Sequence, residues 1–367
     1  MGGEYPCGVI GISLLTLVPG ISGGSETYAR ELCRALARVG ELRYRVFLPD
    51  IAADASDGLP GSVVGGYRAS RTMPGRIAAM SLAAARPQPL RRALGVDSLD
   101  AIHFPLSVML PRVQQPPVVT TVLDLQHEEH PQFFGRAELT YRKVVYGWTV
   151  RRSRIVITIS EHARQTLIER HRLAPERVRA IPLAVDHATF TPDDRPSDKV
   201  SQGAYLLYPA RPWRHKNHAR LFEAFAQLRG ERPRLRLVLT SEGDFGTLPD
   251  GVEARGRVSR GELVELYRGA DALVFPSLYE GFGIPILEAM ACGCPVACSN
   301  TTSLPEVAGN AARLFDPRDV GEIAAAVDDV LREPEPWRAR GLERAKRFTW
   351  DACARAHDEV YREVSSG

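Results

Sequence analysis

The sequence lacks the features that mark a membrane-spanning or disulfide-stabilised protein. No stretch of its 367 residues approaches the ~20 apolar residues that a membrane span needs. None of the six cysteines forms a C-x-x-C pair, and the clustered Cys292, Cys294 and Cys298 have no histidines at zinc spacing. We therefore expect reduced, buried cysteines and no metal site.

A large excess of one charge is also missing. The formal net charge of +3 is too small to indicate nucleic acid as the main partner, and it fits an enzyme with a local cationic site for an anionic ligand. The first apolar run, Gly8–Val18, has no basic leader and is broken by Gly11, which disfavours a signal peptide. The predicted location is the cytoplasm, with the inner face of the membrane as an alternative.

Short apolar runs alternate with amphipathic stretches along most of the chain, which predicts α/β units with parallel sheets and crossover helices. The predicted strands are Gly8–Thr16, Tyr44–Leu48, Ala101–Phe104, Val118–Val122, Ile155–Ile159, Tyr205–Tyr208, Leu235–Leu239, Ala272–Phe275 and Pro295–Cys298. The predicted helices include Ser25–Val39, Asn217–Arg229, Arg260–Gly269 and Pro285–Ala291.

A polar, proline-containing segment without periodicity interrupts this alternation after Asp186. We therefore predict two doubly wound, Rossmann-like domains, residues 1–190 and 203–349, joined by a linker at 191–202. Ligands of open parallel sheets bind beyond the carboxyl ends of the strands. Two such units predict a ligand site in the cleft between them.

The strongest motif runs from Phe275 to Asn300. A strand ends at Phe275, and a glycine-containing turn, Gly281–Gly283, leads into a helix whose first turn holds Pro285. Glycines let a ligand approach the backbone, and a helix start offers free N–H groups and a positive dipole end to an anion.

Two carboxylates flank this turn. Glu280 precedes the glycines, and Glu288 lies about one turn into the helix. Carboxylates accept hydrogen bonds from hydroxyl groups, so the pair suits a ligand that carries both sugar hydroxyls and phosphates. The plainer alternative is a pair of solvated acids around a helix cap.

A second motif, Tyr208–Asn217, follows the first strand of the second domain. It places Arg211 and Lys216 at the carboxyl end of a strand, where cations would meet a diphosphate. Asn217 is a good N-cap residue for the next helix. Arg214 is expected to be a solvated residue of the same loop.

A third motif, Pro19–Arg30, places Gly23 and Gly24 before a helix in the first domain. The simplest alternative is a plain turn. Its position after the first strand favours a wall of the ligand cleft.

At these residues the chain resembles retaining glycosyltransferase family 4, also called glycosyltransferases group 1, whose two facing Rossmann-like domains form the GT-B fold. Glu280 to Glu288 resembles the family's E-x7-E element, and Arg211 with Lys216 resembles its basic donor-phosphate pair. Gly23 and Gly24 resemble its N-terminal glycine loop. The resemblance covers nearly the whole chain.

The resemblance implies a role for each matching residue. Arg211 and Lys216 would hold the donor diphosphate, and Glu288 would bind the ribose. The transferred sugar would meet Glu280 and the backbone of the turn, and the nucleotide base would lie near Val258. The full set expected to bind the donor is Gly23, Gly24, Arg211, Lys216, Val258, Glu280, Gly281, Phe282, Gly283, Ile284 and Glu288. The last helix, at about 350–367, would return to the first domain.

One departure concerns the loop after Val118–Val122, where many relatives have a His-Asp pair. This chain has Asp124 in its place and a histidine only at His127. We expect His127 to take over the missing role, so that Asp124 and His127 join Glu280 and the two cations in catalysis. The alternative is that His127 is structural.

The sequence thus predicts a retaining, metal-independent hexosyltransferase that uses a nucleotide-diphosphate sugar, GDP-mannose or a UDP-hexose, as substrate and needs no cofactor. The acceptor is a glycan, a lipid-linked sugar or a natural product. A nucleotide-sugar epimerase, a sugar phosphorylase and a non-catalytic sugar-nucleotide-binding protein remain alternatives. An oxidoreductase is disfavoured, because Gly20–Gly24 does not fit the dinucleotide fingerprint.

One stretch, Tyr141–Arg154, mixes basic and aromatic residues on a predicted helix. Such a helix can lie on anionic lipid, giving weak peripheral membrane contact through the first domain. An ordinary surface helix packed on that domain is the favoured interpretation. The oligomeric state is not predicted.

Overall fold

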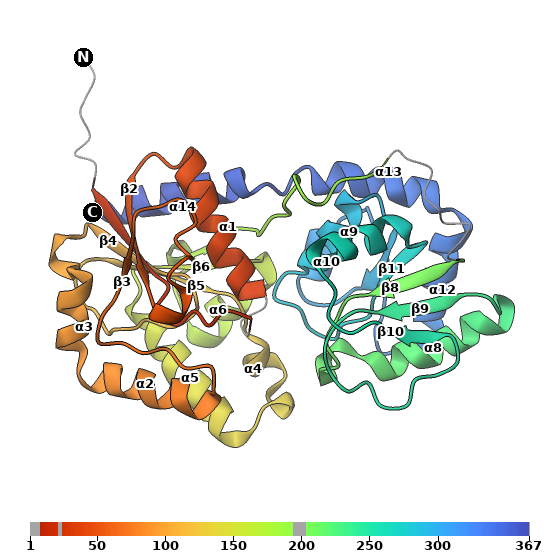
Figure 1. Cartoon of the computed structure of the whole chain (residues 1–367), viewed down its shortest axis with the longest axis horizontal. Helices are drawn as coiled ribbons and strands as arrows, with labels where there is room; N and C mark the ends of the chain where they lie inside the picture. The colour runs from red at the N-terminus through yellow and green to blue at the C-terminus, as the bar shows by residue number, and fades with distance from the viewer. Residues whose placement is uncertain (1–7, 21–23, 194–202, 367) are drawn as a thin grey trace, which may run out of the picture. The chain divides into compact units, whose positions relative to one another are not determined.

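The computed structural model describes residues 8–20, 24–193 and 203–366. The chain divides into two compact units (Figure 1). Unit 1 comprises Met1–Leu183 and Trp350–Gly367, and unit 2 comprises Ala184–Thr349. The division therefore falls before the predicted domain end at 190. Of the predicted linker, residues 194–202 lie outside the described residues.

Unit 1 is built on a seven-stranded parallel sheet in the order β3-β2-β1-β4-β5-β6-β7. Its strands are β1 Val9–Ser13, β2 Arg43–Leu48, β3 Gly61–Val63, β4 Ala101–Phe104, β5 Val118–Val122, β6 Ile155–Thr158 and β7 Val178–Ala180. Its α-helices are α1 Gly24–Val39, α2 Met73–Ala85, α3 Pro87–Leu94, α4 Gln126–Glu129, α5 Arg136–Arg152, α6 Glu161–His171 and α14 Trp350–Ser365. The central strands β4, β5 and β6 are buried at every residue, as expected for a parallel sheet covered on both faces.

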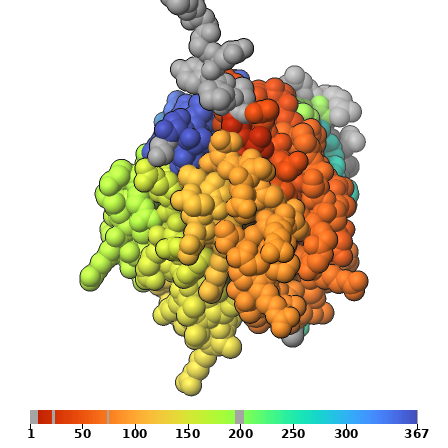
Figure 2. All heavy atoms as spheres, turned by 90° about the vertical axis from the view of Figure 1, so that its left-hand side faces the viewer, coloured from red at the N-terminus to blue at the C-terminus, as the bar shows by residue number. Residues whose placement is uncertain are grey.

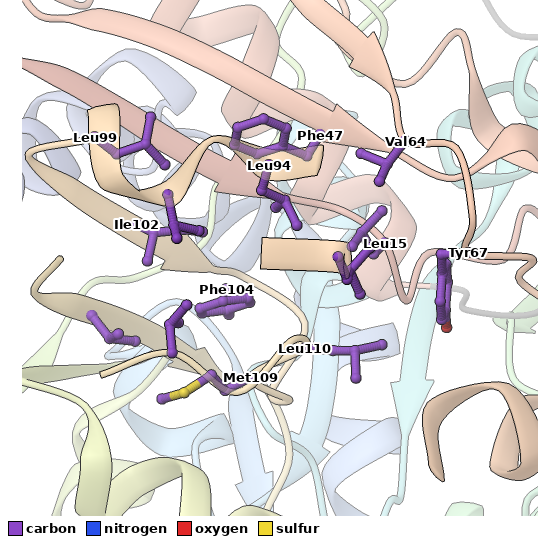
Figure 3. Packing of buried hydrophobic residues seen from close by; sticks show 14 residues of the cluster. Leu15, Phe47, Val64, Tyr67, Leu94, Leu99, Ile102, Phe104, Met109 and Leu110 are labelled. Atoms are coloured by element: carbon purple, nitrogen blue, oxygen red, sulfur yellow. The ribbon is translucent and has the colours of Figure 1, made fainter. Parts of the chain in front are cut away.

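A hydrophobic core lies on the side of this sheet that carries α2 and α3. Phe47 of β2 and Ile102 of β4 pack in one cluster with Leu94 of α3 (Figure 3). Partly buried Met80 of α2 and Trp148 of α5 pack against the same cluster. These contacts fix α2 and α5 on unit 1 through one side each.

The last helix, α14, is held on unit 1 by a buried series of hydrogen bonds. The series runs from Tyr361 to His103 (2.8 Å), from His103 to Thr121 (2.8 Å), from Thr121 to Tyr28 (2.8 Å) and from Tyr28 to His357 (2.9 Å). It links α14 to β4, β5 and α1. All five residues are at most 1% exposed. Water therefore cannot satisfy these polar groups, and each one needs its partner in the series for a hydrogen bond.

The lowered pKa values of the two histidines and one backbone carbonyl assign the protons of these hydrogen bonds: burial lowers the pKa of His357 to about 4 and that of His103 well below 6.5, so both rings are neutral at pH 7. His357 Nδ1 is 2.8 Å from the carbonyl oxygen of Cys353, which can only accept, so Nδ1 carries the hydrogen and Nε2 accepts from Tyr28. Tyr28 then accepts from Thr121, Thr121 accepts from His103 Nε2, and Tyr361 donates to His103 Nδ1. Both imidazoles are neutral in this assignment, which agrees with their lowered pKa values.

Unit 2 is built on a six-stranded parallel sheet in the order β10-β9-β8-β11-β12-β13. Its strands are β8 Tyr205–Tyr208, β9 Arg236–Leu239, β10 Val252–Ala254, β11 Ala272–Phe275, β12 Val296–Ser299 and β13 Arg313–Phe315. Its α-helices are α8 His218–Glu231, α9 Arg260–Gly269, α10 Ile284–Ala291, α11 Leu304–Ala308, α12 Val320–Arg332 and α13 Pro334–Ala345. Because β8, β11 and β12 are neighbours, the loops that follow them meet at one edge of the sheet.

Among the described residues, no helix combines the length and the apolar character that a membrane crossing requires.

Candidate functional site

The loop after β11 is held in place by hydroxyl groups from the loop after β12. Thr302 Oγ1 accepts the N–H of Glu280 at 3.1 Å. Ser303 Oγ lies 3.0 Å from the carbonyl oxygen of Glu280 and 2.9 Å from that of Phe282. These contacts hold the carbonyl groups of the turn toward α11. The carbonyls of Glu280 and Phe282 are therefore occupied within the protein.

The N–H groups of the same turn have no such partners. Within the described part of the chain, Gly281, Phe282 and Gly283 donate no backbone hydrogen bond. Helix α10 begins immediately afterwards, with Pro285 in its first turn. Free N–H groups at a helix start attract an anion, as the sequence predicts for this turn.

Gly283 is required by the shape of this turn. Its φ of 111° lies in a region that side chains rarely adopt, and a Cβ placed there would lie 2.7 Å from Leu304 Cδ2. Only glycine satisfies both conditions. The turn therefore depends on this residue for its conformation and for its close packing on α11.

Lys216 joins the loop after β8 to the loop after β11. Its Nζ donates to Glu280 Oε1 at 2.5 Å, and the two side chains are 14% and 13% exposed. Tyr208 Oη donates to the Lys216 carbonyl at 2.7 Å and lies 3.2 Å from Ser277 Oγ. The structure thus brings together the cation of one predicted motif and the first carboxylate of the other.

Asn217 starts α8 as predicted, but its side chain does not cap the helix. The residue has a φ of 62°, and its amide donates instead to the carbonyls of Pro276 (3.1 Å) and Pro317 (2.7 Å). The side-chain amide nitrogen therefore connects neighbouring loops by hydrogen bonds and does not bond within the helix. The expectation of a side-chain cap was wrong: the amide oxygen, which would accept a backbone N–H in a cap, accepts instead from Arg220 Nη1 at 3.1 Å.

Arg211 lies on the same loop but is not brought into contact with the turn. Its guanidinium carbon is 5.4 Å from the ring centre of Trp213, whose side chain is 52% exposed. No hydrogen bond or ion pair joins Arg211 to Glu280 within the described residues. Its role toward a diphosphate stays a prediction.

Glu288 lies on α10 against α9. Tyr267 Oη donates to Glu288 Oε2 at 3.0 Å. Burial raises the pKa of the Glu288 carboxyl to about 7, while the Tyr267 hydrogen bond and the charge of Arg260 oppose the shift. A carboxyl held in this way is partly protonated near neutral pH. Its contact with Tyr267 was not predicted, and no sequence spacing signals it.

The remaining donor-side residues have simple positions. Val258 is half-buried just before Ser259, which caps α9 by accepting from the N–H of Glu262. Ile284 is half-buried as the first residue of α10. In unit 1, Gly24 is the first residue of α1, and Gly23 lies outside the described residues. A Cβ at Gly24 would meet nothing within 4 Å.

The two candidate residues that follow β5 have different surroundings. The Asp124 side chain is 41% exposed; its Oδ1 accepts from the Gln126 N–H at 2.6 Å, and its Oδ2 lies 3.6 Å from Arg142. Asp124 is therefore accessible at the edge of unit 1.

His127 is a buried residue of α4. Its side chain is 0% exposed, its ring centre is 5.0 Å from that of Tyr146, and its Nε2 is 3.4 Å from Glu128 Oε1. Burial lowers the pKa of the imidazole to about 4, so it is neutral at pH 7. In this conformation the His127 side chain offers no surface to a sugar. The burial favours the structural alternative for His127, and its role in catalysis stays a prediction.

The sequence analysis did not single out the hydroxyl groups of Thr302 and Ser303. Both follow β12, the neighbour of β11, as the sheet order shows. Their place after a predicted strand at the same sheet edge was the available signal.

Family models and related sequences match this chain. A model of the family "Glycosyl transferases group 1" matches residues 190–348, and a model of "Glycosyltransferase Family 4" matches residues 22–189. The chain is 32% identical over 298 residues to O-antigen chain mannosyltransferase B of Escherichia coli, covering 75% of this chain and 77% of that protein. It is 27% identical to the MMP alpha-(1->4)-mannosyltransferase of Mycolicibacterium hassiacum, covering 99% of this chain and 89% of that one.

Solved structures share the fold at lower identity. Sucrose-phosphate synthase from Thermosynechococcus elongatus superposes with a TM-score of 0.77 at 21% identity, covering 98% of this chain and 99% of that chain. Anabaena HepE in complex with UDP-glucose gives 0.71 at 17% identity, covering 97% and 100%. The solved structures show the GT-B fold, and the two family models together with the 32% identical relative define the class of this protein as a glycosyltransferase. It belongs to the glycosyltransferases of group 1.

Proposed function

We propose that this glycosyltransferase moves mannose from a nucleotide-diphosphate donor to a carbohydrate-type acceptor, with retention of the anomeric configuration and without a metal ion or other cofactor. Mannose is favoured over glucose because two relatives that match most of the chain are named as mannosyltransferases. The acceptor is a glycan, a lipid-linked sugar or a natural product.

The observation that carries this proposal is the contact between Lys216 and Glu280 beside the free N–H groups of the Gly281–Gly283 turn. In the transfer, the bond between the anomeric carbon and the phosphate oxygen breaks, and the diphosphate leaves with the electron pair. A fixed cation and N–H dipoles lower the barrier by stabilising that growing charge.

The acceptor oxygen bonds to the anomeric carbon on the face that the diphosphate leaves, and its proton passes to the departing phosphate oxygen. Glu280 would then accept a hydroxyl hydrogen of the sugar, and Glu288 one of the ribose. Arg211 would add a second cation by a change of side-chain rotamer away from Trp213.

The test replaces Lys216 and compares it with a neighbour. Lys216→Ala is expected to lower turnover at least about 100-fold, since a preorganised group that stabilises the leaving charge is lost. Arg214→Ala is the matched control, because Arg214 is an exposed cation of the same loop. Thermal unfolding of both variants checks the fold. Near-normal turnover of the Lys216 variant, or an equal loss in the control, contradicts the proposal.

Donor and product assays separate the remaining possibilities. GDP-mannose and UDP-glucose are supplied with and without chelator, and the product is analysed by NMR for its anomeric configuration. Conversion of donor without an acceptor indicates an epimerase, phosphate-dependent cleavage indicates a phosphorylase, and binding without turnover indicates a silent binding protein. Loss of activity on chelation contradicts metal independence.

A further inference from the structure

Helix α2 of unit 1 presents an uncharged face to solvent. Its exposed positions between the two ends are Ile77, Ala78, Ser81, Leu82 and Ala85. Their spacing of one, three, one and three residues places them on one side of a helix. Ile77 is 44% exposed and Leu82 is 63% exposed.

The opposite side of α2 is already used for packing. Ala79, Met80 and Ala83 lie against the hydrophobic core of unit 1. A surface helix normally turns polar and charged residues outward once its apolar side is buried. Helix α2 instead has apolar residues on both sides. Its outer face is therefore suited to contact with a second apolar surface outside unit 1.

Helix α5 extends this face. Tyr141 Oη lies 3.5 Å from Met80 Sδ, which joins the two helices, and Val144, one turn further along α5, is 61% exposed. Figure 2 shows the orange segment that contains α2 next to the yellow segment that contains α5. We call the exposed apolar residues Ile77, Leu82 and Val144, together with the exposed cations Arg86, Arg92 and Lys143, the α2–α5 surface.

The α2–α5 surface is also strongly cationic. Between Asp57 and Asp97 the chain contains six arginines and no carboxylate. Three cations are exposed: Arg86, which directly follows α2, Arg92 in the last turn of α3, and Lys143 beside Val144 on α5. None of these three forms an ion pair within residues 24–193 of the structure. Their charges are therefore available to an external anion.

We propose that the α2–α5 surface binds the surface of an anionic phospholipid bilayer. Apolar side chains that project from a helix enter the acyl boundary, while arginines and lysines beside them contact the phosphates. The complementary charge selects this partner, because the surface offers unpaired cations and apolar groups, while the carboxylate of α5, Glu138, is already paired with Arg142. The inference is independent of the donor chemistry.

The proposed membrane contact is centred on α2 and not on Tyr141–Arg154, the stretch that the sequence suggested. Within Tyr141–Arg154, Trp148 packs on the core and Arg112 stacks over its ring at 4.7 Å. Only Lys143 and Val144 of that stretch belong to the surface. Helix α2, which has few charges and drew no attention in the sequence, supplies two of its three exposed apolar residues.

Flotation of the full chain with vesicles tests the proposal. We expect binding to vesicles of phosphatidylcholine mixed with phosphatidylglycerol and little binding to phosphatidylcholine alone. Arg86→Gln/Arg92→Gln should weaken binding roughly five-fold for each arginine removed, and Ile77→Gln/Leu82→Gln should also weaken it. The matched controls are Val63→Gln, an apolar residue 52% exposed on β3, and Arg318→Gln, an arginine 62% exposed in unit 2.

Several results would overturn the proposal. Equal binding to neutral and anionic vesicles removes the charge selection, and equal losses in controls and test variants remove the site. A chain that stays in solution with both vesicle types has no bilayer affinity. A dimer that Ile77→Gln/Leu82→Gln dissociates in gel filtration would show that a second copy covers α2 instead. All variants change exposed residues, and their thermal unfolding confirms that they are folded.

Discussion

The segment after β11 in unit 2 and the segment after β5 in unit 1 leave their parallel sheets at the same kind of edge, but they use polar residues differently. In unit 2, Lys216 and Glu280 pair with each other and stay partly exposed, and Thr302 and Ser303 hold the turn by hydrogen bonds to its backbone. In unit 1, His127 is buried, and neither ring nitrogen has a hydrogen-bond partner among the described residues. A polar residue near a strand end is therefore a site candidate only where its neighbours leave it accessible.

After the Lys216 substitution, the largest effect is expected from breaking the turn in unit 2. Gly283→Ala forces a side chain into a φ of 111° and against Leu304, which displaces the N–H groups of the turn. A misplacement of this kind lowers turnover up to about 100-fold, measured as kcat/KM with the preferred donor. Gly261→Ala is the control, because a Cβ there meets nothing within 4 Å. A fully active Gly283 variant would show that the turn is not part of the site.

The next largest effect is a loss of folding stability of unit 1 at acid pH. Burial holds the pKa of His357 at about 4 and that of His103 well below 6.5. An unfolded histidine binds a proton near pH 6.5, so stability is complete above that pH and falls as the pH drops toward 4. The loss is about 1.4 kcal/mol per pH unit for each histidine.

Urea unfolding of unit 1, followed between pH 7 and 5, measures this slope. His357→Gln removes one of the two titrating groups, so its stability should depend less steeply on pH than that of the unchanged chain. An identical slope in both proteins would mean that the His357 imidazole is not held neutral. His187→Gln serves as a control, since His187 is a partly buried histidine of unit 2.

Unit 2 should respond to pH in the opposite direction. The Glu288 carboxyl has a raised pKa of about 7 against an ordinary value of 4.5, so the folded state holds a proton that the unfolded chain releases. Stability is complete below pH 4.5 and falls as the pH rises through 7. Glu288→Gln should remove this slope and raise the melting temperature more at pH 8 than at pH 5, while it weakens donor binding. An equal shift at both pH values would contradict the raised pKa.

The smallest effect is expected at His127. His127→Leu replaces a buried neutral ring by an apolar side chain and should leave kcat/KM nearly unchanged, because the imidazole contacts no exposed surface. Asp124→Asn is the informative companion, since Asp124 is accessible after the same strand. A loss at His127 as large as that expected for Lys216 would return His127 to the site.

Much of the fold was predictable because apolar runs of parallel strands are nearly continuous. Ala101–Phe104, Val118–Val122, Tyr205–Tyr208 and Ala272–Phe275 were predicted with the bounds that the structure has. The strands that were not predicted, β3, β7, β10 and β13, have three residues each and lie away from the sheet centres. Partly exposed strands of that length carry too little hydrophobic pattern to be recognised.

The sequence by itself determined the class of the protein and the turn of unit 2, because a glycine, a proline and two carboxylates at fixed spacing can be read without neighbours in space. Only the tertiary structure decided that Lys216 meets Glu280, that Glu288 is shared with Tyr267, that His127 is buried and that α2 faces solvent with apolar residues. Those properties depend on which segments pack together. Burial and pairing determine the protonation state and the accessibility of a side chain more strongly than its position in the sequence does.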